Sequence, residues 1–335
     1  MTEPRSTRDA YRDHLVRMMR DDPRIVCLDT DTGLFGGVDF GDAADRYLNL
    51  GIAEQNLMGV AAGMAAAGRI PFVNTMATFA ANRAAEMVKL DIAYNALPVR
   101  IAATHAGVSA GHLGPTHHAL EDLGTMRAWP NMTVLAPADA ATVTALLDET
   151  ADRPGPVYLR LGRGPTPPLP PGLPPVRLGA LHPVRTGREA VLLAVGPQLL
   201  PRCAAAVDLL AERGLAAGLL HAHTLKPFDA ATLLEWAGPA RLVVTVEDHW
   251  RSGGLGSLVA ETLSERLPRP VLRLGLPDGF ADEAGSEAWI LDRAGLSPGD
   301  IAAAVAAADP GPAEAGLPSV RLVPTTIAKR SVRHG

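Results

Sequence analysis

Four of the ten histidines in this chain fall within one glycine-rich segment, "THAGVSAGHLGPTHH", at residues 104–118. They are His105, His112, His117 and His118. An imidazole exchanges its proton near neutral pH and can donate or accept a hydrogen bond, so a cluster of histidines suits proton transfer or the binding of a polar substrate. A zinc site is a second possibility, although no cysteine or nearby carboxylate completes a good set of ligands.

A single carboxylate stands at the head of an apolar run in "GIAEQNLMG", residues 51–59. Glu54 precedes the almost wholly apolar residues 57–67. One interpretation is a helix-start carboxylate, because the first turn of a helix has unpaired N–H groups and the positive end of the helix dipole. The other is a functional acid that faces a ligand. A further charged candidate, Arg163, follows a predicted strand at 156–161.

These side chains need a framework that brings them together, and the chain alternates short apolar runs with longer helical ones. That alternation is typical of an α/β fold with a parallel sheet, in which ligands lie beyond the carboxyl ends of the strands. We therefore expect chemistry in the loops that follow the strands of the first half. The predicted strands of the first half are 24–28, 70–74, 98–105, 132–137 and 156–161, and its predicted helices are 7–20, 53–67, 77–95, 119–128 and 139–151. In the second half the predicted strands are 190–194, 216–221, 241–246 and 270–274, and the predicted helices are 198–213, 229–238 and 255–267.

The composition indicates an ordinary globular protein of about two domains. The chain has 335 residues, of which 47% are apolar, and a net charge of -5, with no basic cluster that would indicate a nucleic-acid surface. Its two cysteines, Cys27 and Cys203, give neither a disulfide framework nor zinc spacing. The N-terminus lacks a signal-peptide core and no apolar run reaches the length of a membrane span, so we expect a soluble, cytoplasmic protein.

Five motifs follow one another along the chain: "NLGIAEQNLMGVAAGMAAAG", "FVNTMATFAANRAAEMV", "THAGVSAGHLGPTHHALEDLGTMRAWPNMTVLAPAD", "VYLRLGRG" and "HTLKPFD…VVTVEDHWRSGGLG". Together they resemble the C-terminal half of transketolase, most closely the small subunit of split, two-chain transketolases. The resemblance covers about residues 8–310. It implies two doubly wound α/β domains, a pyrimidine-binding domain of thiamine diphosphate enzymes at 1–165 and a transketolase C-terminal domain at 185–310. The proline-dense residues 166–184 are predicted to form a linker, and residues 311–335 a tail.

The resemblance implies a role for Glu54. In this family the matching glutamate hydrogen-bonds a ring nitrogen of the aminopyrimidine of thiamine diphosphate and favours the imino tautomer, which can take the proton from the thiazolium carbon. Phe79 matches the aromatic residue that packs on the aminopyrimidine. Ile52 and Asp31 match weaker neighbours of the cofactor.

Other residues match positions that bind substrate in the family. His105 and His117 match histidines that contact the sugar donor, and the resemblance makes both catalytic together with Glu54. Arg163 matches an arginine that binds the phosphate or carboxylate end of the substrate. Where the family usually has GEDG, this chain has "GHLG", so that His112 replaces a glutamate and Leu113 replaces an aspartate that hydrogen-bonds a substrate hydroxyl. These two departures predict a specialised substrate in place of an ordinary pentose phosphate.

One family motif is missing from the chain. The family binds the diphosphate through Mg²⁺ with a GDG…N motif on another domain, and "GDAAD" at 41–45 does not supply it. The resemblance therefore implies a large partner subunit, most simply in an α2β2 assembly, and no metal ligand in this chain.

Two other functions compete with a transketolase-type subunit, which would transfer a two-carbon ketol or a related acyl unit from a ketose or 2-oxo acid to an aldehyde. The beta chain of a 2-oxo acid dehydrogenase decarboxylase shares the architecture and the glutamate, but lacks the "GPTHH…LED…MR…PNM" spacing found here. A non-catalytic scaffold is the third possibility, and the intact Glu54, Phe79, His105 and His117 argue against it.

Overall fold

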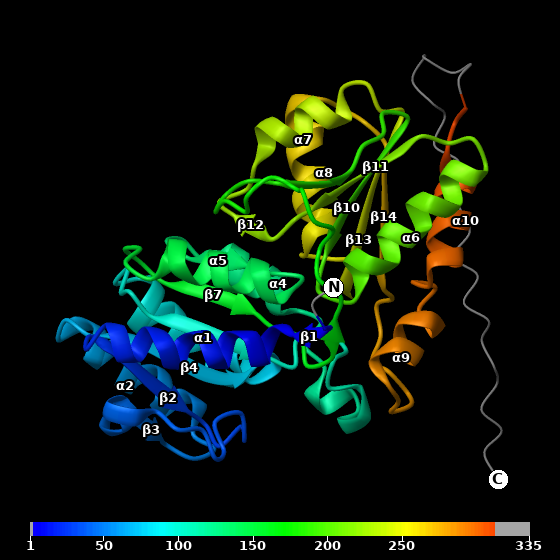
Figure 1. Ribbon diagram of the computed structural model, residues 1–335. Helices are drawn as coiled ribbons and strands as arrows, with labels where there is room; N and C mark the ends of the chain where they lie inside the picture. The colour runs from blue at the N-terminus through cyan, green and yellow to red at the C-terminus, as the bar shows by residue number, and fades with distance from the viewer. Residues whose placement is uncertain (1–2, 312–335) are drawn as a thin grey trace, which may run out of the picture.

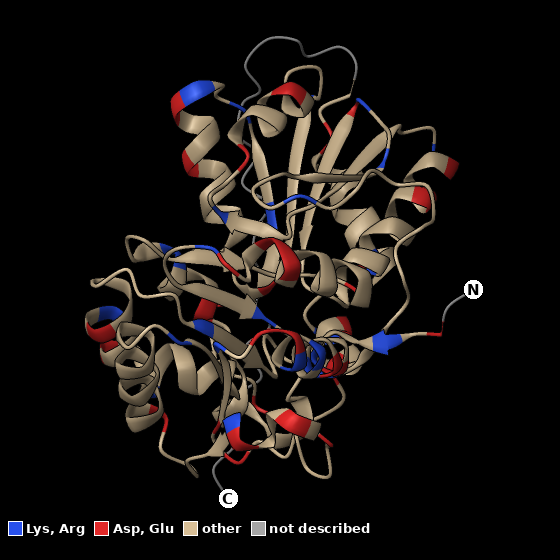
Figure 2. Ribbon diagram, turned by 60° about the vertical axis from the view of Figure 1, so that its left-hand side comes forward, with Lys and Arg blue, Asp and Glu red and all other residues tan. Residues whose placement is uncertain are grey.

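The computed structural model of the chain describes residues 3–311, and it forms two α/β domains that pack against each other (Figure 1). The first half of the chain builds the lower domain in this view and the second half builds the upper one. The predicted tail lies outside the described residues apart from Gly311. No helix among residues 3–311 is long and apolar enough to cross a membrane. Figure 2 shows acidic and basic residues interspersed over both domains.

The first domain contains a seven-stranded sheet. From one edge to the other, its strands are β12 (Thr224–Lys226), β6 (Thr133–Leu135), β7 (Val157–Arg160), β5 (Arg100–Thr104), β4 (Ile70–Met76), β2 (Ile25–Asp29) and β3 (Tyr47–Asn49). All the strands from β6 to β3 run parallel, as the alternating pattern predicts. The carboxyl ends of these parallel strands therefore lie at the same end of the sheet, which is called its carboxyl edge below.

Helices cover both faces of this sheet. Helices α1 (Thr7–Asp21) and α5 (Ala140–Thr150) bury residues such as Tyr11, Leu15 and Leu146 on one face. Each of these two helices begins at a side-chain cap, Ser6 for α1 and Asp139 for α5, which accepts a hydrogen bond from a free N–H of the first turn. The other face is covered by α2 (Glu54–Ala66), α4 (Asp122–Ala128) and the segment 79–93.

The segment 79–93 differs from its prediction as one regular helix. It consists of the π-helices η2 (Phe79–Arg83) and η3 (Val88–Ala93), joined by the short α-helix α3 (Ala85–Met87). A π-turn takes in one residue more than an α-turn and is frequent at functional sites, and periodicity of apolar residues does not reveal it. Phe79 and Arg83 stand at the two ends of η2.

The second domain is a five-stranded sheet with helices on both faces. Its strand order is β14 (Val271–Leu276), β13 (Leu242–Trp250), β10 (Ala190–Val195), β11 (Ala217–His221) and β9 (His182–Arg185), the last of which is antiparallel. The helices are α6 (Leu199–Glu212), α7 (Ala230–Ala237), α8 (Leu255–Arg266), α9 (Glu287–Arg293) and α10 (Pro298–Ala308). A small antiparallel pair, β1 (Arg5–Ser6) with β8 (Pro165–Thr166), joins the start of the chain to the end of the first domain.

The two domains share backbone pairing and a hydrophobic core. Strand β12 comes from the second half of the chain but pairs antiparallel with β6 at the edge of the first sheet, a pairing that the sequence pattern did not reveal. One continuous cluster of buried apolar residues includes Leu57 and Ile101 from the first domain and Leu193 and Val259 from the second. The relative placement of the domains is therefore fixed by packing and by hydrogen bonds.

A buried ion-pair network adds to these contacts between the two domains, which together form the domain joint. Arg160, at the end of β7, donates from Nε to Asp122 Oδ2 at 2.8 Å and from Nη1 to Asp248 Oδ1 at 2.5 Å. The Tyr158 hydroxyl donates to the same oxygen of Asp122 at 2.8 Å. All four side chains are buried, and Asp248 belongs to the second domain, so the charge of Arg160 is neutralised from both sides of the joint.

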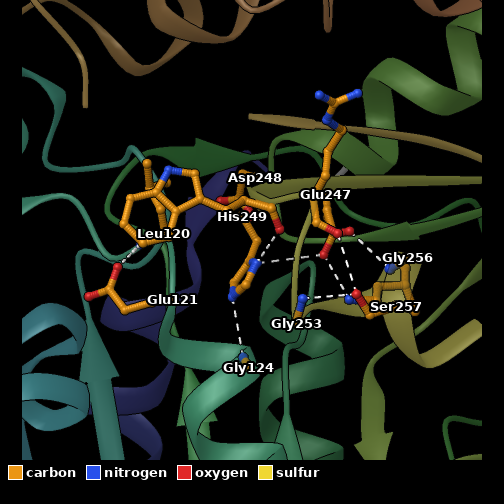
Figure 3. Close-up of polar contacts among 12 residues, drawn as sticks. Leu120, Glu121, Gly124, Glu247, Asp248, His249, Gly253, Gly256 and Ser257 are labelled. Carbon is orange, nitrogen blue, oxygen red and sulfur yellow. Dashed lines mark hydrogen bonds and ion pairs between the residues drawn. The ribbon is translucent and has the colours of Figure 1, made fainter. Parts of the chain in front are cut away.

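Figure 3 shows how the strand residues next to Asp248 continue the joint. The N–H of Gly124 donates to Nε2 of His249 at 3.2 Å across the domain boundary. Glu247 accepts from the N–H groups of Leu255 at 2.7 Å and Gly256 at 2.9 Å, which satisfies the free donors at the start of α8. Segment 247–256 therefore anchors the second domain to the start of α4.

Candidate active site

The predicted site residues gather at the carboxyl edge of the first sheet. Glu54 begins α2, in the connection after β3, and Phe79 follows β4. His105 comes directly after β5, and His117 ends the 3-10 helix η5 (Pro115–His117) in the same loop. Arg163 lies three residues after the end of β7. The parallel sheet thus brings to one edge residues that are more than 100 positions apart in the sequence.

Glu54 is a buried carboxylate held by an arginine. Its side chain is 2% exposed, and its Oε2 accepts a hydrogen bond from Nη1 of Arg83 at 2.9 Å. The preceding Ala53 offers no side-chain cap, so α2 begins without the local cap seen at α1 and α5. Burial of a charge is unfavourable unless it is paired, and here the partner comes from the helix that also carries Phe79.

Phe79 lies between a cation and an imidazole. The guanidinium carbon of Arg83 is 4.5 Å from the centroid of the Phe79 ring, within the range of a cation–π contact. The ring of His117 stands edge-on to the same phenyl ring, with centroids 5.5 Å apart. Glu54, Phe79, Arg83 and His117 are therefore one local cluster.

His105 is buried in a conformation that a residue with a side chain seldom adopts. Its φ is 57°, in the left-handed region, where strain is often retained for function. Burial lowers the pKa of His105 to about 4, and the positive charges of Arg8 and Arg163 act in the same direction. The imidazole is therefore neutral at pH 7. Its Nδ1 lies 3.0 Å from the Thr104 hydroxyl and its Nε2 lies 3.4 Å from Nη1 of Arg8.

Two arginines and an exposed loop complete the cluster. Arg163 is exposed, and its Nη1 lies 3.3 Å from Nδ1 of His112. Leu113, the next residue in the loop, is 41% exposed. Arg8, from α1, lies near Arg163, and burial together with that second cation lowers the pKa of Arg8. Two planar cations that lie close to each other favour the binding of an anionic group.

The second domain helps to hold this loop in place. Gly107, two residues after His105, has a φ of 59°, and a Cβ at this position would collide with the carboxylate of Asp248. The loop therefore approaches the second domain at this point so closely that only glycine fits. Through Asp248 the buried Arg160 network touches the segment that carries His105.

The remaining predicted residues are more exposed. Ile52 is 75% exposed and lies beside the start of α2. Asp31 has a φ of 59° and is exposed, and its carboxylate accepts a hydrogen bond from Asn49 at 3.3 Å. In residues 3–311 no group of three or more His, Cys, Asp and Glu side chains is arranged to hold a metal ion.

Sequence reasoning missed Arg8 and Arg83. Arg8 lies in an apparently ordinary amphipathic helix, and nothing in its spacing distinguishes it from the other arginines of that helix. Arg83 lies four residues after Phe79 within "ATFAANR", and the proximity of a cation to an aromatic candidate was the available signal.

Comparisons with known proteins agree with this architecture. Residues 3–168 match the family described as transketolase, pyrimidine binding domain, and residues 179–301 match that described as transketolase, C-terminal domain. The chain is 37% identical over 296 residues to the 6-deoxy-6-sulfo-D-fructose transketolase subunit SqwH of Clostridium sp. (strain MSTE9), covering 88% of this chain and 91% of that protein. It is 36% identical over 283 residues to one of the subunits of the apulose-4-phosphate transketolase of Phocaeicola vulgatus, covering 81% and 87%.

A solved structure extends the likeness to three dimensions. The chain superposes with a TM-score of 0.82 on a split-gene transketolase described as an inactive beta4 tetramer, with 41% sequence identity, and the match covers 91% of this chain and 98% of that one. These findings favour a transketolase subunit over the 2-oxo acid dehydrogenase alternative. The chain belongs to the transketolase family, whose members are thiamine diphosphate enzymes, and it is the C-terminal, small subunit of a two-chain transketolase.

Proposed function

We propose that this chain supplies the aminopyrimidine-binding and substrate-binding half of a thiamine diphosphate-dependent active site. The enzyme would transfer a two-carbon ketol, or a related acyl unit, from a ketose or 2-oxo acid to an aldehyde. The observation that carries this proposal is the buried Glu54 carboxylate linked through Arg83 to the Phe79 ring, at the same sheet edge as His105, His117 and Arg163.

The residues present fit the aminopyrimidine of the cofactor. The guanidinium of Arg83, a planar hydrogen-bond donor, contacts both Glu54 and Phe79. The space between these two side chains therefore suits another planar group that donates a hydrogen bond, as the aminopyrimidine does. When bound, the cofactor supplies the reactive thiazolium carbon and the electron sink. Glu54 would hold a proton on the ring nitrogen it faces, and Phe79 would orient the ring by packing. Ile52 and Asp31 are proposed as further cofactor neighbours, and Mg²⁺ is proposed to bind the large partner.

The histidines and arginines would act on the substrate. His105 is neutral at pH 7 because burial lowers its pKa to about 4, so it can donate or accept a hydrogen bond without carrying charge. His117, whose ring stands edge-on to Phe79, would exchange a proton with a substrate oxygen. Arg163 and Arg8 would hold the anionic end of the substrate.

A partner subunit must complete this site. The relatives of this chain are named as subunits of transketolases, and a small subunit implies a large one. The GDG…N motif for the diphosphate and Mg²⁺ is missing from the whole sequence. Glu54 lies beside Ile52, whose exposed side chain would be covered by the large subunit in an α2β2 assembly.

The test of this proposal is reconstitution. The purified chain alone is expected to show no transketolase turnover, and co-expression with the large subunit that carries GDG…N is expected to restore turnover and thiamine diphosphate binding together. Turnover by the purified chain in the absence of any partner would contradict the proposal. Equilibrium sedimentation of the reconstituted enzyme checks the α2β2 stoichiometry.

The substrate preference should depend on Leu113. An aspartate at this position would give a substrate hydroxyl a charge-assisted hydrogen bond of about 1.5–3 kcal/mol, which leucine cannot form. His112 is the other candidate donor: its Nδ1 lies 3.3 Å from Nη1 of Arg163, so its Nε2 is the atom that could serve a substrate hydroxyl in place of the aspartate. Because Leu113 cannot form this bond, we expect the wild-type complex to prefer aldehydes without a 2-hydroxyl, and Leu113→Asp to raise kcat/KM for 2-hydroxyaldehydes about tenfold or more relative to their deoxy analogues.

An acceptor panel of matched hydroxylated and deoxygenated aldehydes measures this preference in the assembled enzyme. Leu90→Asp, a similarly exposed leucine on η3, is the control for the added charge. A wild-type enzyme that prefers 2-hydroxyaldehydes, with no shift in Leu113→Asp, would mean that this position does not set specificity.

A further inference from the structure

The side chain of Arg83 spans Glu54 and Phe79. Its Nη1 lies 2.9 Å from Oε2 of Glu54, and its guanidinium carbon lies 4.5 Å from the centroid of the Phe79 ring. The carboxylate is 2% exposed, whereas the Arg83 side chain is 48% exposed. One planar group therefore satisfies a buried charge and covers an aromatic face, while much of its own surface stays in contact with solvent.

The same two contacts are those that the proposed function assigns to the aminopyrimidine ring. That ring is also flat, presents a donor to Glu54 once its ring nitrogen is protonated, and needs the face of Phe79. A guanidinium and an aminopyrimidine cannot both use Glu54 Oε2 and lie on the same face of one phenyl ring, because each fills the van der Waals space that the other needs.

We propose that Arg83 is a placeholder for the cofactor: it occupies the aminopyrimidine position in the cofactor-free chain and is displaced when thiamine diphosphate binds. This inference rests on the proposed function. The placeholder keeps the Glu54 carboxylate paired before the cofactor arrives, since an unpaired buried carboxylate would be strongly unfavourable. It also reduces the apparent affinity for the cofactor, because only the fraction of molecules with Arg83 displaced is competent to bind.

Displacement of Arg83 is structurally simple. Arg83 is the last residue of η2, and its side chain is already half exposed in the single chain, so a change of rotamer moves the guanidinium away from Glu54 without altering the backbone. The lost pairing of Glu54 is replaced by the hydrogen bond to the cofactor. The exchange therefore substitutes one planar donor for another at a carboxylate that remains buried.

The first test needs no cofactor. In the purified full chain, Arg83→Met and Glu54→Gln are each expected to lower the Tm by about 2–4 °C, and the double variant is expected to fall by less than the sum of the two shifts. Arg266→Met, at an exposed arginine of α8, is the matched control and should leave the Tm unchanged. Additive shifts would show that the two side chains are not paired, and would overturn the inference.

The second test measures thiamine diphosphate binding to the assembled complex at saturating Mg²⁺ by titration calorimetry. Arg83→Met is expected to lower the Kd about five- to thirtyfold, because the competing side chain is gone. Arg83→Lys, which keeps the charge but not the planar group, should give an intermediate Kd. An unchanged or higher Kd in Arg83→Met would overturn the placeholder. If the wild-type complex does not bind thiamine diphosphate at all, the proposed function fails instead, so the two failures are distinguishable.

Discussion

Glu54→Gln should slow proton–deuterium exchange at the thiazolium carbon of thiamine diphosphate about 10²–10⁴-fold in the assembled complex, the range that one positioned acid–base group contributes. Glutamine has nearly the same volume as glutamate and can keep a hydrogen bond. Its amide is neutral, however, and cannot favour a proton on the ring nitrogen that Glu54 is proposed to face. Quenched-flow exchange followed by NMR of the cofactor measures this rate directly.

The exchange measurement separates the proposed role of Glu54 from a contribution to folding. Glu86→Gln, at an exposed glutamate of α3, controls for the change of charge and should leave the exchange rate unaltered. Thiamine diphosphate should remain bound to the Glu54→Gln complex at saturating concentration. An exchange rate close to that of the wild type under those conditions would rule out the assigned role.

Arg160→Met should destabilise the chain by about 3–5 kcal/mol, the range for removing one member of a buried ion pair. The change leaves the carboxylates of Asp122 and Asp248 buried without their cation, and each of these aspartates is under 5% exposed. Methionine fills part of the volume but cannot donate a hydrogen bond to either. Denaturation of the purified chain by urea gives the free energy of unfolding.

An exposed ion pair supplies the comparison for Arg160. Arg24 pairs with Asp22 and Asp152 at the surface, each at 2.6 Å, and Arg24→Met should change the free energy of unfolding by less than about 1 kcal/mol. The triple variant Asp122→Asn, Arg160→Met, Asp248→Asn removes all three charges and should recover part of the loss. If Arg160→Met were no more harmful than Arg24→Met, the network would not hold the domains together.

The strand-end loops of the first domain were predictable from the sequence. Apolar runs such as 70–74 and 98–105 are short, nearly continuous and bounded by loops, and a parallel sheet leaves one edge for the residues that follow them. His105 and Arg163 therefore reach one edge of the sheet without further information, whereas Phe79 was chosen through resemblance to a family. Resemblance to a family was still needed to choose Glu54, because a carboxylate at a helix start is common.

Two kinds of contact were not predictable. One depends on the direction in which a side chain points, and the other on pairing between segments that are distant in the sequence. Strand β12 is only three residues long, and its pairing with β6 is decided by how two domains meet. Arg160 did carry a signal: an arginine inside the apolar strand "VYLRL" requires buried acidic partners. Its partners, Asp122 and Asp248, lie 38 and 88 residues away along the chain, and only the fold identifies them.

The pairing of β12 with β6 at the domain boundary also limits how the two domains can move. Rotation of one domain against the other would separate β12 from β6, withdraw Asp248 from Arg160 and open the shared core. The predicted linker 166–184 overlaps β8 and β9 at its two ends, and the proline-dense stretch 167–181 between them connects two domains that already share a sheet and a core. For the proposed function, this leaves the loops at the carboxyl edge of the first sheet, or displacement of one subunit relative to the other, as the source of the opening that admits substrate.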